Sequence, residues 1–164
     1  MSESFIPYGR HVIDDDDVAA VVQVLRGDWL TTGPLVAQFE DSFSSYVGAD
    51  HAVAVSNGTV ALHLAMLAAG IGPGDEVIVP ALTFAASANC VRYAGGTVIF
   101  ADVSDDTLTV DPAHVASLIT PRTKAIVAVD NAGLPCDLDE LLVLCTRHGI
   151  LLVEDACHAV GAEY

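Results

Sequence analysis

Short, uninterrupted apolar runs alternate with helical segments from residue 51 onward. Five runs predict strands, at residues 52–55, 76–80, 97–101, 124–129 and 150–154. Segments with helical spacing lie between them, at residues 60–69, 84–93, 112–119 and 138–148. Because the runs are apolar throughout, we expect strands that are covered on both faces. This alternation predicts an α/β fold with a mainly parallel sheet and helices on both of its faces.

The first 50 residues have a different pattern. Residues 5–13 look extended, and the run Asp14–Asp17 opens a helix that continues to about Arg26. The four aspartates are typical of a solvated helix N-terminus, and a cation site is the alternative. Pro34 suits the first turn of a second helix. Apolar side chains recur along that helix at helical spacing, at Leu35, Phe39, Phe43 and Tyr46.

The composition limits what the chain can bind. It has 22 acidic and 6 basic residues, a net charge of −16 and 52% hydrophobic residues. That hydrophobicity excludes a disordered acidic protein, and so few basic residues disfavour nucleic acid or an anionic membrane as a partner. No apolar run approaches the ~20 residues that cross a bilayer, and no secretory signal is visible. The cysteines lack metal-binding spacing, so we expect a cytoplasmic protein without a metal site.

Polar residues follow several of the predicted strands. Active sites of parallel sheets gather at the carboxyl ends of strands, so these residues are the ones to inspect. Asn57-Gly58-Thr59 is a glycine turn that enters a helix. Free amide groups and the helix dipole make such a turn a seat for phosphate, although a plain helix cap has the same pattern. Neither a P-loop nor a dinucleotide-binding pattern is present.

Three further residues lie at strand ends. Phe84 follows the second run and could stack on a flat ring or belong to the core. Asp155 directly follows the last run, where a buried carboxylate is costly without a positive or hydrogen-bonding partner. His158 projects near Asp155 or lies on the surface. A phosphate seat, an aromatic platform and this aspartate together suit pyridoxal phosphate, with Asp155 keeping the ring nitrogen protonated.

Several stretches resemble a known family. They are Ile6–Arg10, Gly27–Pro34, Ser56–Leu64, Gly72–Val77, Thr83–Asn89 and Glu154–Ala162. Together they resemble the DegT/StrS-type nucleotide-sugar aminotransferases, which are fold-type I enzymes dependent on pyridoxal phosphate, and the likeness covers nearly the whole chain. The opening stretch and Pro135–Asp137 look most like the altrosamine transaminase branch, which aminates C4 of UDP-linked 4-keto-6-deoxy-N-acetylhexosamines.

The resemblance implies roles for individual residues. Gly58 and Thr59 would hold the cofactor phosphate, and Phe84 would stack on the pyridine ring. Asp155 would pair with the ring nitrogen, and His158 would lie near the phenolic oxygen of the ring.

It also implies a reaction and its substrates. Glutamate would donate an amino group to the cofactor, and a nucleotide-linked keto-sugar would then accept it, in the biosynthesis of cell-surface polysaccharide or amino sugars. Thr31 and Thr32 lie in the loop that reaches toward the sugar. The complete enzyme is expected to be a homodimer.

Two departures from the family pattern stand out. Relatives carry histidine in a Val-His-x-x-Gly pattern, whereas this chain has Asp130 there, which changes the local charge. The Schiff-base lysine of the family lies beyond Tyr164, so no catalytic residue is assigned. The one lysine, Lys124, enters a strand at the edge opposite the pocket.

We therefore expect an N-terminal piece of such an enzyme. Residues 1–50 would form an extended segment and two helices. Residues 51–164 would form the N-terminal part of the large cofactor-binding domain, incomplete at its C-terminus, with the small C-terminal domain absent. The chain alone would be inactive. The alternatives are a non-catalytic partner or scaffold of an intact relative, and a pyridoxal-phosphate-dependent sugar dehydratase of the same family.

Overall fold

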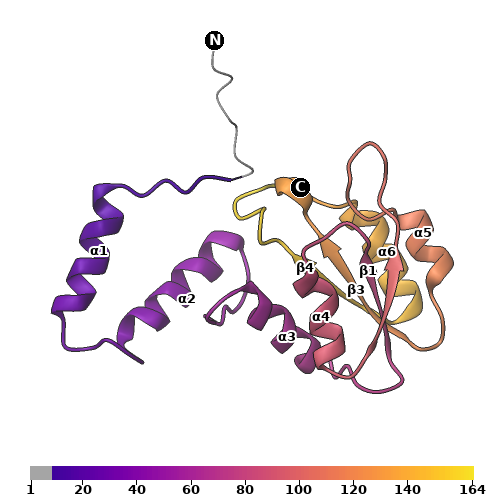
Figure 1. The fold of residues 1–164 in the computed structure, drawn as a ribbon, viewed down its shortest axis with the longest axis horizontal. Coiled ribbons are helices and arrows are strands. Elements are labelled where there is room, and N and C mark those ends of the chain that lie inside the picture. The colour runs from indigo at the N-terminus through magenta and orange to yellow at the C-terminus, as the bar shows by residue number, and fades with distance from the viewer. Residues whose placement is uncertain (1–8) are drawn as a thin grey trace, which may run out of the picture. The chain divides into compact units, whose positions relative to one another are not determined.

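The structure is a computed structural model that describes residues 9–164 (Figure 1). The chain divides into two compact units, Met1–Ala54 and Val55–Tyr164. Of the segment expected to be extended, residues 5–8 lie outside the described residues, and residues 9–13 have no regular secondary structure. In the described part of the chain, no helix is long and apolar enough to cross a membrane.

The first unit contains the two predicted helices, α1 (Asp15–Arg26) and α2 (Pro34–Val47). Asp14 is the N-cap of α1: its carboxylate accepts the amide protons of Asp16 and Asp17, at 3.0 Å each. Asp17 in turn accepts the amide proton of Asp14, which completes a capping box. The aspartate run therefore begins a helix, as predicted. Neither helix buries a residue.

The second unit is a parallel sheet with helices. Its elements in chain order are α3 (Gly58–Ala68), β1 (Glu76–Pro80), α4 (Ala85–Tyr93), β2 (Thr97–Ala101), α5 (Pro112–Leu118), β3 (Thr123–Val129), the short 3₁₀ helix η1 (Asn131–Gly133), α6 (Leu138–His148) and β4 (Leu151–Asp155). The four strands are parallel and lie in the order β2-β1-β3-β4. The predicted α/β class is confirmed.

The sheet has a separate hydrophobic core on each face. Val77 and Val79 of β1 pack with residues of α3 and α4, whereas Ile78 packs with residues of α5 and α6. Strand β3 divides its side chains in the same way, because successive strand residues point to opposite faces. Helices therefore cover both faces of the sheet, as predicted (Figure 1).

The expectation that every apolar run is covered on both faces is only partly right. The central strands β1 and β3 are buried almost throughout. The outer strands β2 and β4 are not, and Phe100 and Leu151 are more than half exposed. The reason is positional, since the helices that cover the middle of the sheet leave its outer strands partly open.

The predicted strand at residues 52–55 is wrong. The segment has no strand structure, and Val53 is 78% exposed. Its Ala54 amide donates to the Glu40 carboxylate at 2.8 Å, which is a side-chain contact and not a ladder between strands. An apolar run becomes a strand only where a neighbouring strand supplies backbone partners, and the described residues place none beside this run.

Charged side chains gather at the amino edge of the sheet. Glu76 is buried at the start of β1, where its carboxylate accepts hydrogen bonds from the Thr120 hydroxyl and the Arg122 guanidinium. These two donors hold the pKa of Glu76 below its usual value. The Lys124 ammonium donates to the Gly70 carbonyl at 3.0 Å and to Asp75 at 3.1 Å.

Candidate functional site

The N-terminus of α3 lies near the carboxyl end of strand β4, where Gly58 and Asp155 line one pocket. Asn57 caps the helix, since its side-chain oxygen accepts the amide proton of Val60 at 3.0 Å. Gly58 and Thr59 are the first two residues of α3. Their amide groups therefore have no carbonyl acceptor within the helix. A Cβ atom on Gly58 would lie 2.8 Å from Cys157 Sγ, so the close approach of the two segments requires glycine.

Asp155 is a buried carboxylate held by neutral donors. It ends β4 and is 7% exposed. Its Oδ2 atom accepts a hydrogen bond from Ser87 Oγ at 2.8 Å, and its Oδ1 atom accepts the amide proton of Cys157 at 3.4 Å. The ion pairs of His114, Arg122 and Lys124 are made elsewhere, with Asp102, Glu76 and Asp75. Neutral donors on α4 and in the turn after β4 therefore hold this carboxyl group in place.

The thiol of Cys157 also faces this carboxylate. Its hydrogen bond with Asp155, together with burial and the negative charge, raises the pKa of Cys157 to about 11. The thiol is therefore protonated at neutral pH and acts as a weak donor rather than as a nucleophile.

A pocket of about 160 Å³ lies between α3 and the end of β4. Its lining residues are Gly58, Ala61, Leu62, Ala65, Val153, Glu154, Asp155, Ala156 and Cys157. The structure thus brings together three of the features that the sequence predicts, namely the helix N-terminus, the glycine and the strand-end aspartate.

The other predicted site residues are not among those that line this pocket. Phe84 is the N-cap residue of α4 and is 74% exposed, so it is not part of the core. His158 is exposed, three residues after Asp155. Thr31 and Thr32 lie in the loop between α1 and α2, in the first unit, where the Thr32 hydroxyl donates to the Thr31 carbonyl at 2.8 Å.

Asp130, the residue that departs from the expected family pattern, directs its carboxylate toward the α5 and α6 face of the sheet. Its carboxylate is buried and accepts the amide proton of Cys136 at 3.0 Å. Cys136 belongs to the core on the α5 and α6 face of the sheet, whereas the Ser87–Asp155 bond lies on the α4 side. A hydrogen bond with Asp130, helped by burial and charge repulsion, raises the pKa of Glu154 to about 7. The hydrogen bond of Asp130 with Cys136 therefore lies on the α5 and α6 face of the sheet, opposite to the Ser87–Asp155 bond.

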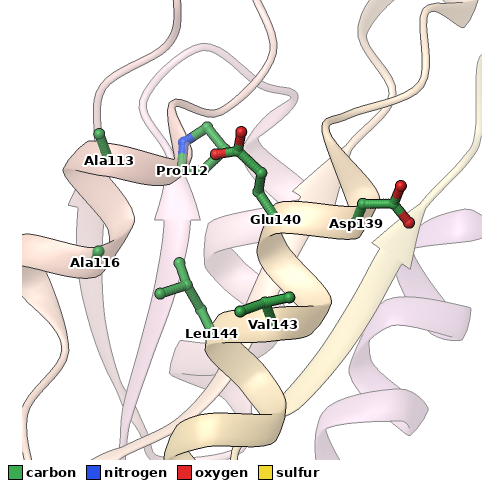
Figure 2. A pocket seen from close by; sticks show the side chains of 7 residues that line it. All are labelled: Pro112, Ala113, Ala116, Asp139, Glu140, Val143 and Leu144. Carbon is green, nitrogen blue, oxygen red and sulfur yellow. The ribbon is translucent and has the colours of Figure 1, made fainter.

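A larger pocket, of about 360 Å³, lies between α5 and α6 (Figure 2). Its walls are mostly alanine, proline, valine and leucine side chains, and its polar side chains are the carboxylates of Asp139 and Glu140. Both carboxylates are in the first turn of α6, where they complement the helix dipole. Two negative side chains suit no anionic ligand, so size alone does not make this pocket the site.

Sequence reasoning missed two residues of the site, Thr83 and Ser87. Their hydroxyl oxygens lie 2.7 Å apart, and Ser87 bonds to Asp155. A signal was present: the two hydroxyl residues are four apart at a helix start, directly after a strand, so they share one side of the chain.

Comparison with protein families matches residues 11–164 to the DegT/DnrJ/EryC1/StrS aminotransferase family. The chain belongs to this family. Aminotransferases of the family depend on pyridoxal phosphate, and their solved structures have the fold-type I architecture, which confirms the expected fold.

Individual members of the family are similar over nearly the whole chain. The spore coat polysaccharide biosynthesis protein SpsC of Bacillus subtilis (strain 168) is 46% identical over 160 residues, which are 98% of this chain and 41% of SpsC. The crystal structure of DesV from S. venezuelae is 45% identical, with a TM-score of 0.87, over 90% of this chain and 40% of DesV.

A third relative has been solved with the cofactor. The sugar aminotransferase Spr1654 from Streptococcus pneumoniae, in its PMP-form, is 33% identical, with a TM-score of 0.90, over 95% of this chain and 43% of Spr1654. A PLP-form of the same protein gives a TM-score of 0.88. The chain thus spans about two fifths of the length of these family members.

Proposed function

We propose that this chain forms the cofactor-binding part of a pyridoxal-phosphate-dependent aminotransferase. The enzyme would transfer an amino group from glutamate to a nucleotide-linked keto-sugar, for cell-surface polysaccharide or amino-sugar biosynthesis. The observation that carries this proposal is Asp155, a buried carboxylate beside a helix N-terminus, in a chain of this family. The name of SpsC, a polysaccharide biosynthesis protein, supports the metabolic role.

The residues present fit the cofactor. The amide groups of Gly58 and Thr59 would hold its phosphate, since they lack intrahelical acceptors and lie at the positive end of α3. Asp155 would hold the proton on the ring nitrogen. The exposed ring of Phe84 is free to stack, and His158 would lie near the phenolic oxygen. When bound, the cofactor supplies a ring that withdraws electrons from the substrate carbon.

Thr31 and Thr32 would contact the sugar, and UDP linked to a 4-keto-6-deoxy-N-acetylhexosamine is the substrate class proposed. All four cysteines are free thiols, which supports a reducing, cytoplasmic setting. A homodimer is proposed because apolar side chains of α2, among them Leu35 and Phe39, are about half exposed or more.

Lys124 is unable to serve this site. Val129 of β3 is the register partner of Asp155, and Lys124 precedes Val129 by five residues. At ~3.3 Å per strand residue, roughly 16 Å of strand separates the lysine from the carboxyl edge. We propose that residues 1–164 alone form no covalent link with pyridoxal phosphate and are inactive as a transaminase.

Cofactor binding and borohydride trapping test both statements. We expect pyridoxal phosphate to bind the chain reversibly, and Asp155→Ala to weaken binding about tenfold, as for loss of a charge-assisted bond. Asp102→Ala is the matched control, because Asp102 also follows a strand but is exposed. Equal weakening by both substitutions would contradict the site. A borohydride-fixed adduct on Lys124, identified by peptide mass spectrometry, would contradict the second statement.

A further inference from the structure

We propose that Thr83 and Ser87 form a directional hydroxyl relay that positions Asp155 as the ionised partner of a protonated ring nitrogen. The inference rests on the proposed function and adds two positioning residues to it. Both hydroxyl groups act through Asp155 and would not themselves touch the cofactor ring nitrogen.

The relay joins two distant parts of the chain. Ser87, on α4, is completely buried, and its Oγ atom lies 2.8 Å from Asp155 Oδ2 on β4. Thr83, in the turn before α4, lies with its Oγ1 atom 2.7 Å from Ser87 Oγ. The two residues at the ends of the Ser87–Asp155 bond are 68 positions apart in the sequence.

Chemistry determines the direction of each bond. An ionised carboxylate only accepts hydrogen bonds, so the single hydroxyl proton of Ser87 must go to Asp155. Ser87 then has no proton left for Thr83, and Thr83 must donate to Ser87. Each donation polarises the next one, which strengthens the charged bond at the end of the chain.

Ser87 departs from the usual behaviour of a helical serine. Serine in a helix commonly bonds to a carbonyl of the preceding turn. Ser117 of α5 and Ser44 of α2 do so, donating to the His114 and Asp41 carbonyls. Ser87 instead directs its proton across to another element, at the one carboxylate that the proposed chemistry requires.

Loss of the relay has a definite chemical consequence. Without the Ser87 hydroxyl, Asp155 keeps the more distant Cys157 amide and the weak thiol donor. A carboxylate with fewer donors holds a proton more tightly. The proton between Asp155 and the ring nitrogen would therefore move toward Asp155, and the ring would lose part of its positive charge.

Nitrogen-15 NMR of ring-labelled pyridoxal phosphate measures this proton directly. In the full chain, we expect the ring nitrogen to be protonated, and Ser87→Ala to move its signal toward that of neutral pyridine. Ser87→Thr, which restores a hydroxyl, should return the signal. Thr83→Val keeps the shape of Thr83 and removes only the outer donor, so its shift should be in the same direction and smaller. Ser117→Ala is the matched control and should leave the signal unchanged.

The outcomes separate the two proposals. If the wild-type chain binds no pyridoxal phosphate or shows a neutral ring nitrogen, the proposed function fails and the relay fails with it. If the wild-type ring is protonated and both Ser87→Ala and Thr83→Val leave its signal unchanged, the relay alone is overturned. If circular dichroism shows that Ser87→Ala does not fold, the buried Ser87–Asp155 hydrogen bond is needed for folding. The nitrogen-15 signal of Thr83→Val then tests the relay: a shift toward neutral pyridine supports it, and an unchanged signal overturns it.

Discussion

Asp155 is a buried carboxyl group that water reaches poorly, so protein groups must replace the water as hydrogen-bond donors. The donors are the Ser87 hydroxyl on α4 and the amide and thiol of Cys157 in the turn after β4. Neutral donors orient the carboxylate without neutralising its charge. This leaves Asp155 able to pair with a cation, which a lysine or arginine neighbour would have prevented.

The contact between Gly58 and Cys157 predicts an energetic coupling between these two residues. Gly58→Ala should lower the free energy of unfolding by about 1 kcal/mol, the low end for an overpacked site, because its Cβ meets Cys157 Sγ at 2.8 Å. In a Cys157→Ala background the same change should cost much less. Urea unfolding of the four chains in a double-mutant cycle measures this coupling.

A glycine where a Cβ atom would make only an ordinary contact supplies the control for that experiment. Gly72→Ala places its Cβ no closer than 4.0 Å to Asp75, and should be insensitive to Cys157→Ala. Equal costs for Gly58→Ala with and without the thiol would show that the close contact has no energetic effect.

The Asp130–Glu154 pair predicts a pH dependence of stability. The pKa of Glu154 rises from its ordinary value of 4.5 to about 7, first through the hydrogen bond with Asp130. The folded chain thus holds this proton more tightly than the unfolded chain. The stability contributed is full below about pH 4.5 and is lost as the pH rises through about 7. Glu154→Gln, which stays neutral, should gain stability relative to wild type between these pH values.

Chemical denaturation at about pH 5 and about pH 8 measures the difference, in the window where this proton is released. Glu140→Gln is the matched control, because Glu140 is an exposed glutamate like Glu154 but the pair does not include it. A gap between wild type and Glu154→Gln that is the same at both pH values would contradict the prediction.

Single residues differ in how far the sequence reveals them. Asp155 is predictable because it ends an apolar run that forms a strand of a parallel sheet, and binding residues gather at that edge, whereas Gly58 is predictable from the glycine turn that enters a helix. The role of Ser87 is harder to predict, because a single hydroxyl residue among alanines forms no repeating pattern and its partner Asp155 is 68 residues away. The orientation of Asp130 depends on the local turn at η1, where Ala132 has a φ of +53°.

At the scale of elements, the N-terminus of α1 depends on its capping box. Asp14→Ala removes the acceptor for two amide protons and should destabilise the helix by about 1 kcal/mol. Amide hydrogen exchange at Asp16 and Asp17 should become correspondingly faster. Asp28→Ala, an exposed aspartate outside α1, should leave both rates unchanged. Unchanged exchange in Asp14→Ala would show that the cap contributes nothing to α1.

Most elements were predictable from the chain, and the exceptions have physical causes. Strands β1 and β2 have the predicted bounds, and α6 agrees at both ends, because apolar runs, capping residues and Gly149 mark them clearly. The run at 52–55 looks equally apolar but lacks a partner strand among the described residues. An apolar run records a preference for burial and carries no information about which backbone lies beside it.

At the scale of the whole molecule, apolar exposure and negative charge oppose each other. The net charge of −16 keeps copies apart, whereas Leu35 and Phe39 favour association. Salt screens the charge and leaves the apolar attraction, so the mean mass in sedimentation should rise with ionic strength. Leu35→Lys with Phe39→Lys should abolish most of that rise.

A second double variant separates the two effects. Asp28→Asn with Asp50→Asn changes the net charge by the same amount, at exposed positions of the first unit. It should increase association at low salt, because it removes repulsion and leaves the apolar side chains in place. A monomeric wild-type chain at every salt concentration would contradict the proposed homodimer.

The position of Asp155 in the chain also determines at what stage of folding the site forms. The strand that carries it, β4, joins the sheet only through β3, and the bond to Ser87 closes a loop of 68 residues. Closing such a loop is slow compared with forming helices. During synthesis and refolding, β1, β3 and their helices should therefore become protected first, and the Cys157 amide last. Pulsed hydrogen exchange would show this order, and early protection at Cys157 would contradict it. The cofactor would then bind only a chain in which β4 has already paired with β3.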